Sequence, residues 1–445
     1  MSTKRWIGAA VPVAQVDTLT IGGTIEVGDL FKVTINNKVF SFAATSTVAA
    51  TNATAFVAAW NALSQSIWPE FQEMTAAATS GGALTITAKA SGKPFTLAVS
   101  TTESDGSSAD SQTFTRTATT ANSGPSVADV PANWQGGVIP ADGDNIVFDT
   151  GKVDVLYNLD QHTISPASIT ILPGYTGKIG LSENNTDGGS TASYPEYRAK
   201  YLQFGNVGDA QTVTVTCSGG GGRIKLDTGT AVTVLQINDT ASSVETNVPT
   251  FLWKGSNTGN TLVIQKGSFG AAFFAGETSQ LYAIEQGFKT NVSGDSAVSL
   301  GAGVTLTNAL ITQTGGTIEI NSAITGTASV QIFGGTMTIN GTGGVTGLGI
   351  FGGTVIYNTT GVLDGNVLIY GKGNLDFTQD LRPKTVTNPI TVNGQQAGLN
   401  DQYLVVGAII STVYTAGVIT VDCVGTGNNP NINLGDNVTI NRSLP

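Results

Sequence analysis

A short glycine motif returns at a nearly constant interval in the last third of the chain, and it constrains the fold more than any other feature. Three copies, at 315–321, 334–340 and 352–358, begin with Gly-Gly-Thr, continue as a short strand-like segment and end in asparagine. The steps between them are 19 and 18 residues. One turn and one short strand cannot bury an apolar face alone, so the copies must stack on one another.

A period near 20 residues with strand chemistry and no helical pattern predicts a β-solenoid, and we expect a right-handed parallel β-helix. A weaker fourth copy at 372–377 belongs to the same series. Two columns of apolar side chains should point into the stack: Ile318, Met337, Val355 and Leu375, and Ile320, Ile339, Tyr357 and Phe377.

The residues between these columns should face outward. They include Glu319, Thr338 and Asp376. Ile356 breaks the alternation and predicts a contact surface on the outside of the stack. The asparagines that end the motif fall in register and should form a ladder of side-chain amides: Asn321, Asn340 and Asn358.

The composition agrees with an all-β protein that contains many tight turns. Of 445 residues, 57 are glycine and only 11% are charged, while 40% are hydrophobic, which is too many for a disordered chain. The net charge of -11 argues against a nucleic-acid-binding surface. No apolar run reaches the roughly 20 residues of a membrane-spanning helix, so we expect neither nucleic acid nor membrane as a partner.

Changes in composition and two pairs of prolines divide the chain into four parts. We expect an N-terminal arm at 1–15, an α+β module at 16–120, the parallel β-helix at 134–382 and a C-terminal β domain at 384–445, so the fold class is mainly β. Hairpin-like spacing in the last part predicts a cap or oligomerisation domain. The arm is too short to fold alone and should become ordered only against a neighbouring subunit or particle protein.

Local signals define the elements of the α+β module. Asn36 and Asn37 interrupt an alternating pattern at 31–42, and this predicts a β-hairpin because asparagine tolerates a positive φ. An alanine-rich segment follows, and Thr51 or Asn52 is expected to cap a helix there.

Two irregular segments mark the β-helix itself. Asn133–Pro140 and the following Gly143–Phe148 resemble the Trp-Gly-Pro-Gly-Asp element at which bacterial autotransporters and other β-helical surface proteins begin or repeat. Trp134 is therefore expected to plug the open end of the solenoid. Ser182–Tyr197 is too polar and irregular for a rung and is expected to protrude as a loop.

The sequence offers little for nucleophilic, metal or phosphate chemistry. The single histidine, His162, lies beside Asp160 without a Gly-x-Ser-x-Gly motif. Cys217 and Cys423 lie far apart and predict two free thiols, with one long-range disulfide left open. Gly219–Gly222 is not followed by the Lys-Ser/Thr of a phosphate loop, so this glycine run predicts a turn. We predict no catalytic, cofactor-binding or metal-binding residues and no cofactor.

Polysaccharide cleavage is the enzymatic alternative, because many β-helices carry it out with two or three carboxylates on one face. Six charged residues are candidates: Glu285, Asp295, Asp364, Asp376, Asp380 and Arg382. They fall at unrelated phases of the repeat, so we expect solvated side chains and no active site. Calcium binding at turn Asp and Asn residues stays open, although the Gly-Gly-x-Gly-x-Asp pattern is missing.

The N-terminal stretch Leu19–Phe40 and the alanine-rich helix after it look like modules of phage tail and particle-surface proteins. The whole layout resembles a bacteriophage virion protein with a β-helix, either tail fibre or head decoration. This resemblance implies a structural role in a virion, assembly as a homotrimer and other capsid or tail proteins as partners.

Two other functions stay open, a tailspike-like polysaccharide depolymerase and a bacterial β-helical surface adhesin. Either would take a host surface glycan as its partner. No secretory signal pattern follows Met1, because Lys4 and Arg5 lead into a short segment broken by Pro12. The chain is therefore expected to stay in the cell, or to leave it by lysis or within a particle.

Overall fold

The structure is a computed structural model. It describes residues 2–109, 111–185, 193–205, 212–241, 245–287, 296–370, 373–377, 379–380, 385–388, 390–393, 403–406, 419–424, 431–434 and 438–443.

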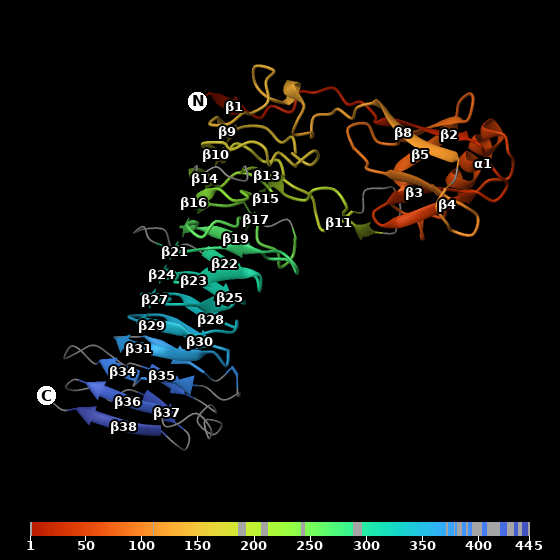
Figure 1. Ribbon diagram of the computed structural model, residues 1–445. Helices are drawn as coiled ribbons and strands as arrows, with labels where there is room; N and C mark the ends of the chain where they lie inside the picture. The colour runs from red at the N-terminus through yellow and green to blue at the C-terminus, as the bar shows by residue number, and fades with distance from the viewer. Residues whose placement is uncertain are drawn as a thin grey trace.

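Parallel strands stack into an elongated body with a smaller unit beside its N-terminal end (Figure 1). Within the described residues the long sheet has 15 strands and the second sheet has 11, and from β13 onward the chain passes repeatedly from one to the other. The long sheet contains, in order, β1 (Thr3–Arg5), β9 (Asn145–Phe148), β10 (Ser168–Ile171), β14 (Thr212–Ser218), β16 (Val232–Asp239), β18 (Thr261–Ile264), β21 (Ala283–Gln286), β24 (Leu310–Gln313), β27 (Ser329–Ile332), β29 (Val345–Ile350), β31 (Val362–Tyr370), β34 (Ile390–Asn393), β36 (Ile419–Val424) and β38 (Val438–Ser443), with β33 (Thr385–Val386) also beside β31.

The second sheet contains β13 (Leu202–Gln203), β15 (Ile224–Asp227), β17 (Phe251–Lys254), β19 (Gly267–Ala271), β22 (Ser296–Leu300), β25 (Thr317–Ile320), β28 (Thr336–Ile339), β30 (Thr354–Tyr357), β32 (Asn374–Asp376), β35 (Tyr403–Val406) and β37 (Asn431–Leu434). A short third sheet contains β20 (Ser279–Gln280), β23 (Val304–Thr307) and β26 (Ile324–Thr325). We call these three sheets the stack, and one circuit of the chain around it a rung. The chain is thus mainly β with long parallel sheets, as the repeat predicts.

The Gly-Gly pairs form the corner between the two long sheets, for example between β24 and β25 and between β27 and β28. The second glycine of each pair has a positive φ: 71° at Gly316, 87° at Gly335 and 77° at Gly353. A Cβ on Gly335 would clash with the carbonyl oxygen of Gly316 in the rung before it. Both the conformation and the close stacking therefore require glycine.

The two predicted columns are confirmed. Ile318, Met337 and Val355 occupy matching positions on β25, β28 and β30, and each is at most 1% exposed. The predicted amide ladder is also present. Asn340 donates to Asn321 at 2.9 Å, and Asn358 donates to Asn340 at 3.0 Å. Between the columns Glu319 is exposed, while Thr338, Ile356 and Asp376 are half-buried in one outward column.

Residues Thr3–Trp6 lie against the stack of their own chain, whereas the arm at 1–15 was expected to order only against a neighbouring subunit or particle protein. β1 pairs in parallel with β9 and forms the first strand of the long sheet. Trp6 is 2% exposed, and its ring centroid lies 5.2 Å from that of Trp134 and 6.4 Å from that of Phe148. Trp134 does lie at the N-terminal end of the stack, as expected. Burial of both tryptophans explains why the segment orders against its own chain.

The unit beside the stack is formed by the chain between β1 and β9. Its strands make two antiparallel sheets, β5 (Met74–Ala78), β6 (Ala83–Ala88), β2 (Val16–Gly23) and β8 (Gln112–Thr120), and β4 (Lys38–Ala43), β3 (Leu30–Ile35) and β7 (Ala98–Thr102), with the helix α1 (Ala49–Asn61). Phe31, Phe56 and Trp60 are buried in an apolar core distinct from that of the stack. We call residues 16–120 the side module. Its independent folding stays a prediction.

The hairpin predicted in the side module is present, and the predicted helix start is wrong. β3 and β4 pair antiparallel around Asn36 and Asn37, whose φ angles are 50° and 62°. The helix α1 begins at Ala49, before Thr51 and Asn52. Asn52 is buried and accepts hydrogen bonds from the backbone of Thr45 and Ser46. Its amide therefore fixes the loop before the helix and does not cap the helix.

The described strands beyond residue 384 continue the stack. β34, β36 and β38 pair in parallel in the long sheet, and β35 and β37 extend the second sheet. The hairpin pairing expected for this part is therefore wrong, because each strand lies against the strand of the rung before it. An oligomerisation role for 384–445 stays a prediction.

Ile339→Asp should lower the free energy of unfolding by several kcal/mol, because it buries an unpaired charge between two rungs. Thr338→Asp is the matched control, since Thr338 lies next to it on the outward face of β28. Circular dichroism melting of both variants measures the effect. Equal melting temperatures for the two variants would contradict the inward column.

Candidate functional site

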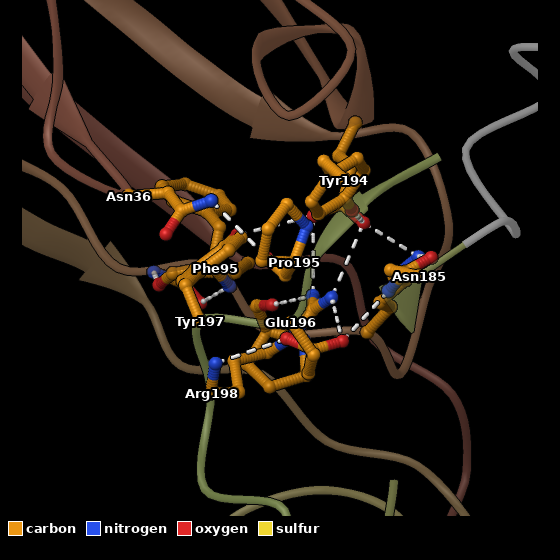
Figure 2. A network of polar contacts seen from close by, with 12 residues as sticks. Asn36, Phe95, Asn185, Tyr194, Pro195, Glu196, Tyr197 and Arg198 are labelled. Carbon is orange, nitrogen blue, oxygen red and sulfur yellow. Dashed lines mark hydrogen bonds and ion pairs between the residues drawn. The ribbon is translucent and has the colours of Figure 1, made fainter. Parts of the chain in front are cut away.

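A short excursion leaves the stack and reaches the side module. β11 (Asn184–Asn185) and β12 (Tyr194–Pro195) pair antiparallel, and the chain then returns to the stack through Glu196, Tyr197 and Arg198. Asn36 of the module's hairpin donates to the carbonyl of Pro195 at 3.1 Å (Figure 2). Of the segment that was expected to protrude as a polar loop, residues 182–185 and 193–197 are described, and Pro195 contacts the module. We call residues 182–185 and 193–198 the junction.

Arg198 lies at the centre of the junction and joins the stack to the module. Its Nε and one terminal nitrogen donate to the two carboxylate oxygens of Glu196 at 2.8 and 2.9 Å (Figure 2). Its terminal nitrogens also donate to Glu73 at 3.1 and 3.3 Å and to the carbonyl of Pro94 at 2.9 Å. A guanidinium group suits this position, because its planar donors can serve two carboxylates at once.

Glu73, which ends the short helix η1 (Phe71–Glu73), is the module's contribution to the junction. Its side chain is 5% exposed and forms an ion pair with Lys93 at 2.6 Å. The Tyr197 hydroxyl donates to its carboxylate at 3.1 Å, and the Tyr194 hydroxyl donates to the other carboxylate oxygen. Two carboxylates and two cations thus meet in a buried cluster whose charges balance.

Burial and pairing shift the pKa values in this cluster in opposite directions. Burial raises the pKa of Tyr194 and Tyr197, and the Glu73 carboxylate adds to this effect, so both phenols stay protonated donors. Burial disfavours the charged form of Glu196, yet hydrogen bonds from Arg198 outweigh it and hold the pKa of the carboxyl below its usual value. The Arg198 pKa is raised, because its carboxylate partners outweigh its burial. The directions for Tyr194, Tyr197, Glu196 and Arg198 all favour the protonation states that form the hydrogen bonds of this cluster.

A groove of about 600 Å³ lies next to the junction, along the second sheet. Gln203, Asp227 and Lys254 occupy matching positions on β13, β15 and β17 and line it. Tyr201 and Glu277 also line it, and Glu277 comes from the loop between β19 and β20. Each of these three successive strands thus contributes one polar side chain to the groove.

The charged groups of the groove contact one another. Lys254 lies 3.3 Å from Asp227, and its ammonium lies 4.4 Å from the ring centroid of Tyr201. Glu277 accepts hydrogen bonds from the Tyr201 hydroxyl at 3.1 Å and from the backbone nitrogen of Phe274 at 3.0 Å. Both carboxylates are engaged, so the groove suits hydrogen bonding to a polar ligand better than proton transfer.

Lys225 is buried beside the groove and is 0% exposed. Its ammonium pairs with Glu183 at 2.8 Å and lies 4.6 Å from the ring centroid of Phe274 and 5.2 Å from that of Tyr201. Burial lowers the pKa of Lys225 and outweighs the opposing effect of Glu183. This ion pair fastens the beginning of the junction, at Glu183, onto the second sheet.

The structure does not bring the predicted charged candidates together. Glu285 and Asp364 are exposed on β21 and β31 of the long sheet, about 19 Å apart along the stack at about 4.8 Å per strand. Asp376 lies on β32 of the second sheet, and Asp380 is buried after it. Asp295 and Arg382 lie outside the described residues.

His162 and Asp160 contact each other on the surface, and both side chains are more than half exposed. Cys217 is a buried free thiol, as expected. Burial raises the pKa of its thiol to about 11, which keeps it protonated and unreactive. Within the residues that the structure describes, no three His, Cys, Asp or Glu side chains gather in a way that could hold a metal ion.

Sequence reasoning missed the junction and the groove. The run Tyr194–Arg198 combines two tyrosines, a carboxylate and an arginine, which is the composition of a buried contact. The partners Glu73 and Lys93 are far away in the sequence, so only the three-dimensional contact reveals their role.

Comparisons with known proteins leave the assignment to the geometry. No protein-family model, curated protein or solved structure matches this chain. None of the helices in the described part of the chain has the length and apolar composition of a membrane span.

Arg198→Met should destabilise the junction by about 3–5 kcal/mol, because it leaves the buried carboxylates of Glu73 and Glu196 without their shared partner. Lys89→Met is a nearby control: the Lys89 backbone donates to the Glu73 carbonyl, while its exposed side chain contacts Gln72 at 3.5 Å. Denaturant unfolding and limited proteolysis measure both. A proteolysis pattern of Arg198→Met identical to that of the control would contradict the anchoring role.

The junction should also weaken in acid. The pKa of Glu196 lies below its value in the unfolded chain, so its contribution is complete above about pH 4.3 and is lost as the pH falls through the folded value. Glu196→Gln should therefore be less stable than the wild type at neutral pH. The difference in unfolding free energy should shrink below about pH 4. A difference that does not change with pH would refute this role of Glu196.

Proposed function

We propose that this chain is a non-enzymatic structural component of a bacteriophage particle, on the head or the tail, and that it assembles as a homotrimer. In this proposal the stack is a right-handed parallel β-helix that serves as a rigid spacer. The resemblance of the N-terminal stretch Leu19–Phe40 to phage particle modules supports the location. Other virion proteins are the partners.

The junction is the observation that carries the proposal. A module formed by the chain between β1 and β9 is held against the side of the stack by Glu73, Arg198 and Glu196, all nearly fully buried. In the described part of the stack, each strand of the two long sheets pairs with the strand of the next rung, so the rungs hold one another in position. A lateral module fixed at one end of such a rod is suited to spacing and attachment, which are mechanical tasks.

The outward faces of the repeats favour a structural role as well. Their outward columns hold threonine and the ladder of Asn321, Asn340 and Asn358, which bonds to itself. Glu285 and Asp364 lie rungs apart, whereas hydrolysis by two carboxylates needs them within about 5–10 Å of each other.

Intact particles test the proposed location. Gold-labelled antibodies raised against residues 16–120 should decorate particles purified from cells that produce this chain, when they are viewed by electron microscopy. Antibodies against an unrelated cytoplasmic protein are the control. Particles without label, together with labelled cell envelopes, would favour the surface adhesin.

The groove favours a second candidate, contact with a surface glycan. Tyr201, Asp227, Lys254 and Glu277 offer hydrogen-bonding groups in fixed positions, as hydroxyl-rich ligands require. This would suit either the depolymerase or the adhesin.

Lys254→Ala tests that candidate, because it removes the cation shared by Asp227 and Tyr201. If the groove binds glycans, the wild type should bind on a glycan array and the variant should lose about ten-fold or more in affinity. Lys266→Ala, at the exposed pair with Asp239, is the control. If our main proposal is right, neither the wild type nor Lys254→Ala binds glycans on the array. Incubation of the wild type with capsular polysaccharide should then release no new reducing ends. Release of reducing ends would establish the depolymerase.

A further inference from the structure

Three aromatic side chains stack on the outside of the long sheet. Phe333 and Phe351 lie with ring centroids 4.8 Å apart and planes at 9°, and Phe351 and Tyr370 lie 5.2 Å apart at 7°. Phe333 and Phe351 directly follow β27 and β29, and Tyr370 is the last residue of β31. These three strands are neighbours in the long sheet (Figure 1). We call them the aromatic ladder.

The ladder is exposed although it is apolar. Phe333 is 49% exposed and Phe351 is 39% exposed. The Phe351 ring lies back over the sheet, since a Cβ on Gly349 would meet it at 2.9 Å. The rings cover Gly349 with apolar surface, and on the same sheet Leu310, which pairs with Ser329 at the other end of these strands, is 47% exposed. Exposed apolar surface of this kind marks an interaction site.

Among the described residues, the outward positions of the strands around the ladder carry no charged side chain. On β24, β27, β29 and residues 366–370 of β31, the residues between the inward-facing ones, and those that follow β27 and β29, are all uncharged: Leu310, Thr312, Ser329, Gln331, Phe333, Gly347, Gly349, Phe351, Asn366, Leu368 and Tyr370. Gly349 is buried beneath the Phe351 ring. The neighbouring acids of this sheet lie at its margins, Glu285 on the preceding rung and Asp364 near the beginning of β31. We call this surface the uncharged face.

We propose that the uncharged face is the surface at which copies of this chain meet. The inference rests on the proposed function, because it names the contact of the homo-oligomer. The chain carries a net charge of -11, so two copies repel each other overall, and an interface without charged side chains avoids adding close repulsion between like charges. Charge-depleted, aromatic-rich surface is also the composition of interface cores.

The spacing of the ladder points to a second copy as the occupant. Its rings repeat at 4.8 and 5.2 Å, which is the strand spacing of the stack. A second stack has the same spacing, so its side chains can interdigitate with the ladder over several rungs. Copies arranged side by side about a rotation axis would each bury this face.

A stacked ladder is poorly suited to a sugar or a base. Those ligands stack on a free ring face. Both faces of Phe351 are covered by Phe333 and Tyr370, so the ladder presents ring edges to the outside. A protein surface can pack against edges, and this favours a second copy over a glycan at this position.

Light scattering after gel filtration, at several protein concentrations, tests the proposal. The wild type should elute as an oligomer, and the double variant Phe333→Ser/Phe351→Ser should raise its dissociation constant by about ten-fold or more. The control Ile67→Ser/Val138→Ser removes two side chains that are exposed elsewhere, at 62% and 54%, and should assemble like the wild type.

Ser329→Glu provides a second variant that keeps the ladder intact. It adds one negative charge to the outward face of β27 and should also dissociate the oligomer, even if the double variant fails to fold. Circular dichroism melting reports folding for each variant. A monomeric wild type would overturn both this inference and the proposed oligomer. An oligomeric wild type whose folded Ser329→Glu variant assembles unchanged would overturn the uncharged face alone.

Discussion

Backbone hydrogen bonding between successive rungs is the interaction on which the rest of this structure depends. A strand inside a parallel sheet satisfies its backbone groups only when a rung lies on each side. Every rung must therefore turn at the same place, and the Gly-Gly corners at Gly316, Gly335 and Gly353 allow this with positive φ angles. The buried columns, the asparagine ladder and the aromatic ladder all follow from that common register.

Charge has two distinct roles on this frame. At the junction, two carboxylates and two cations are buried and neutralise one another: Glu73, Glu196, Arg198 and Lys93. Removing any one of these side chains would leave a buried charge without its partner and would destabilise the contact with the side module. On the uncharged face, charge is missing although the chain as a whole is acidic. The balanced charges hold the module against the stack, and the uncharged face is the surface at which we propose that copies of the chain meet.

The sequence predicted those features whose partners repeat at a fixed interval or lie next to each other. Met337 and Ile339 were placed inward by their phase, and Asn36 and Asn37 predicted the hairpin turn by their tolerance of a positive φ. The helix start at Ala49 was missed, because Asn52 resembles a cap and bonds to the loop at Ser46. Of the candidate site, the sequence predicted neither the junction nor the groove, and the acids that it singled out, such as Glu285, lie elsewhere.

The repeat alone determined that the chain folds as stacked parallel strands, because period, glycine corners and alternating apolar positions leave few other ways to bury the apolar side chains. Tertiary structure decided the rest. Trp6 packs on Trp134, although the whole side module separates them in the sequence. The strands from β34 to β38 pair in parallel with earlier rungs, and Arg198 forms an ion pair with Glu73. The Trp6–Trp134 and Arg198–Glu73 contacts join segments that are distant in the sequence, and the β34 to β38 rungs lack the Gly-Gly-Thr motif that marks the earlier ones. Their partners are chosen by shape and charge in three dimensions, and no local pattern encodes that choice.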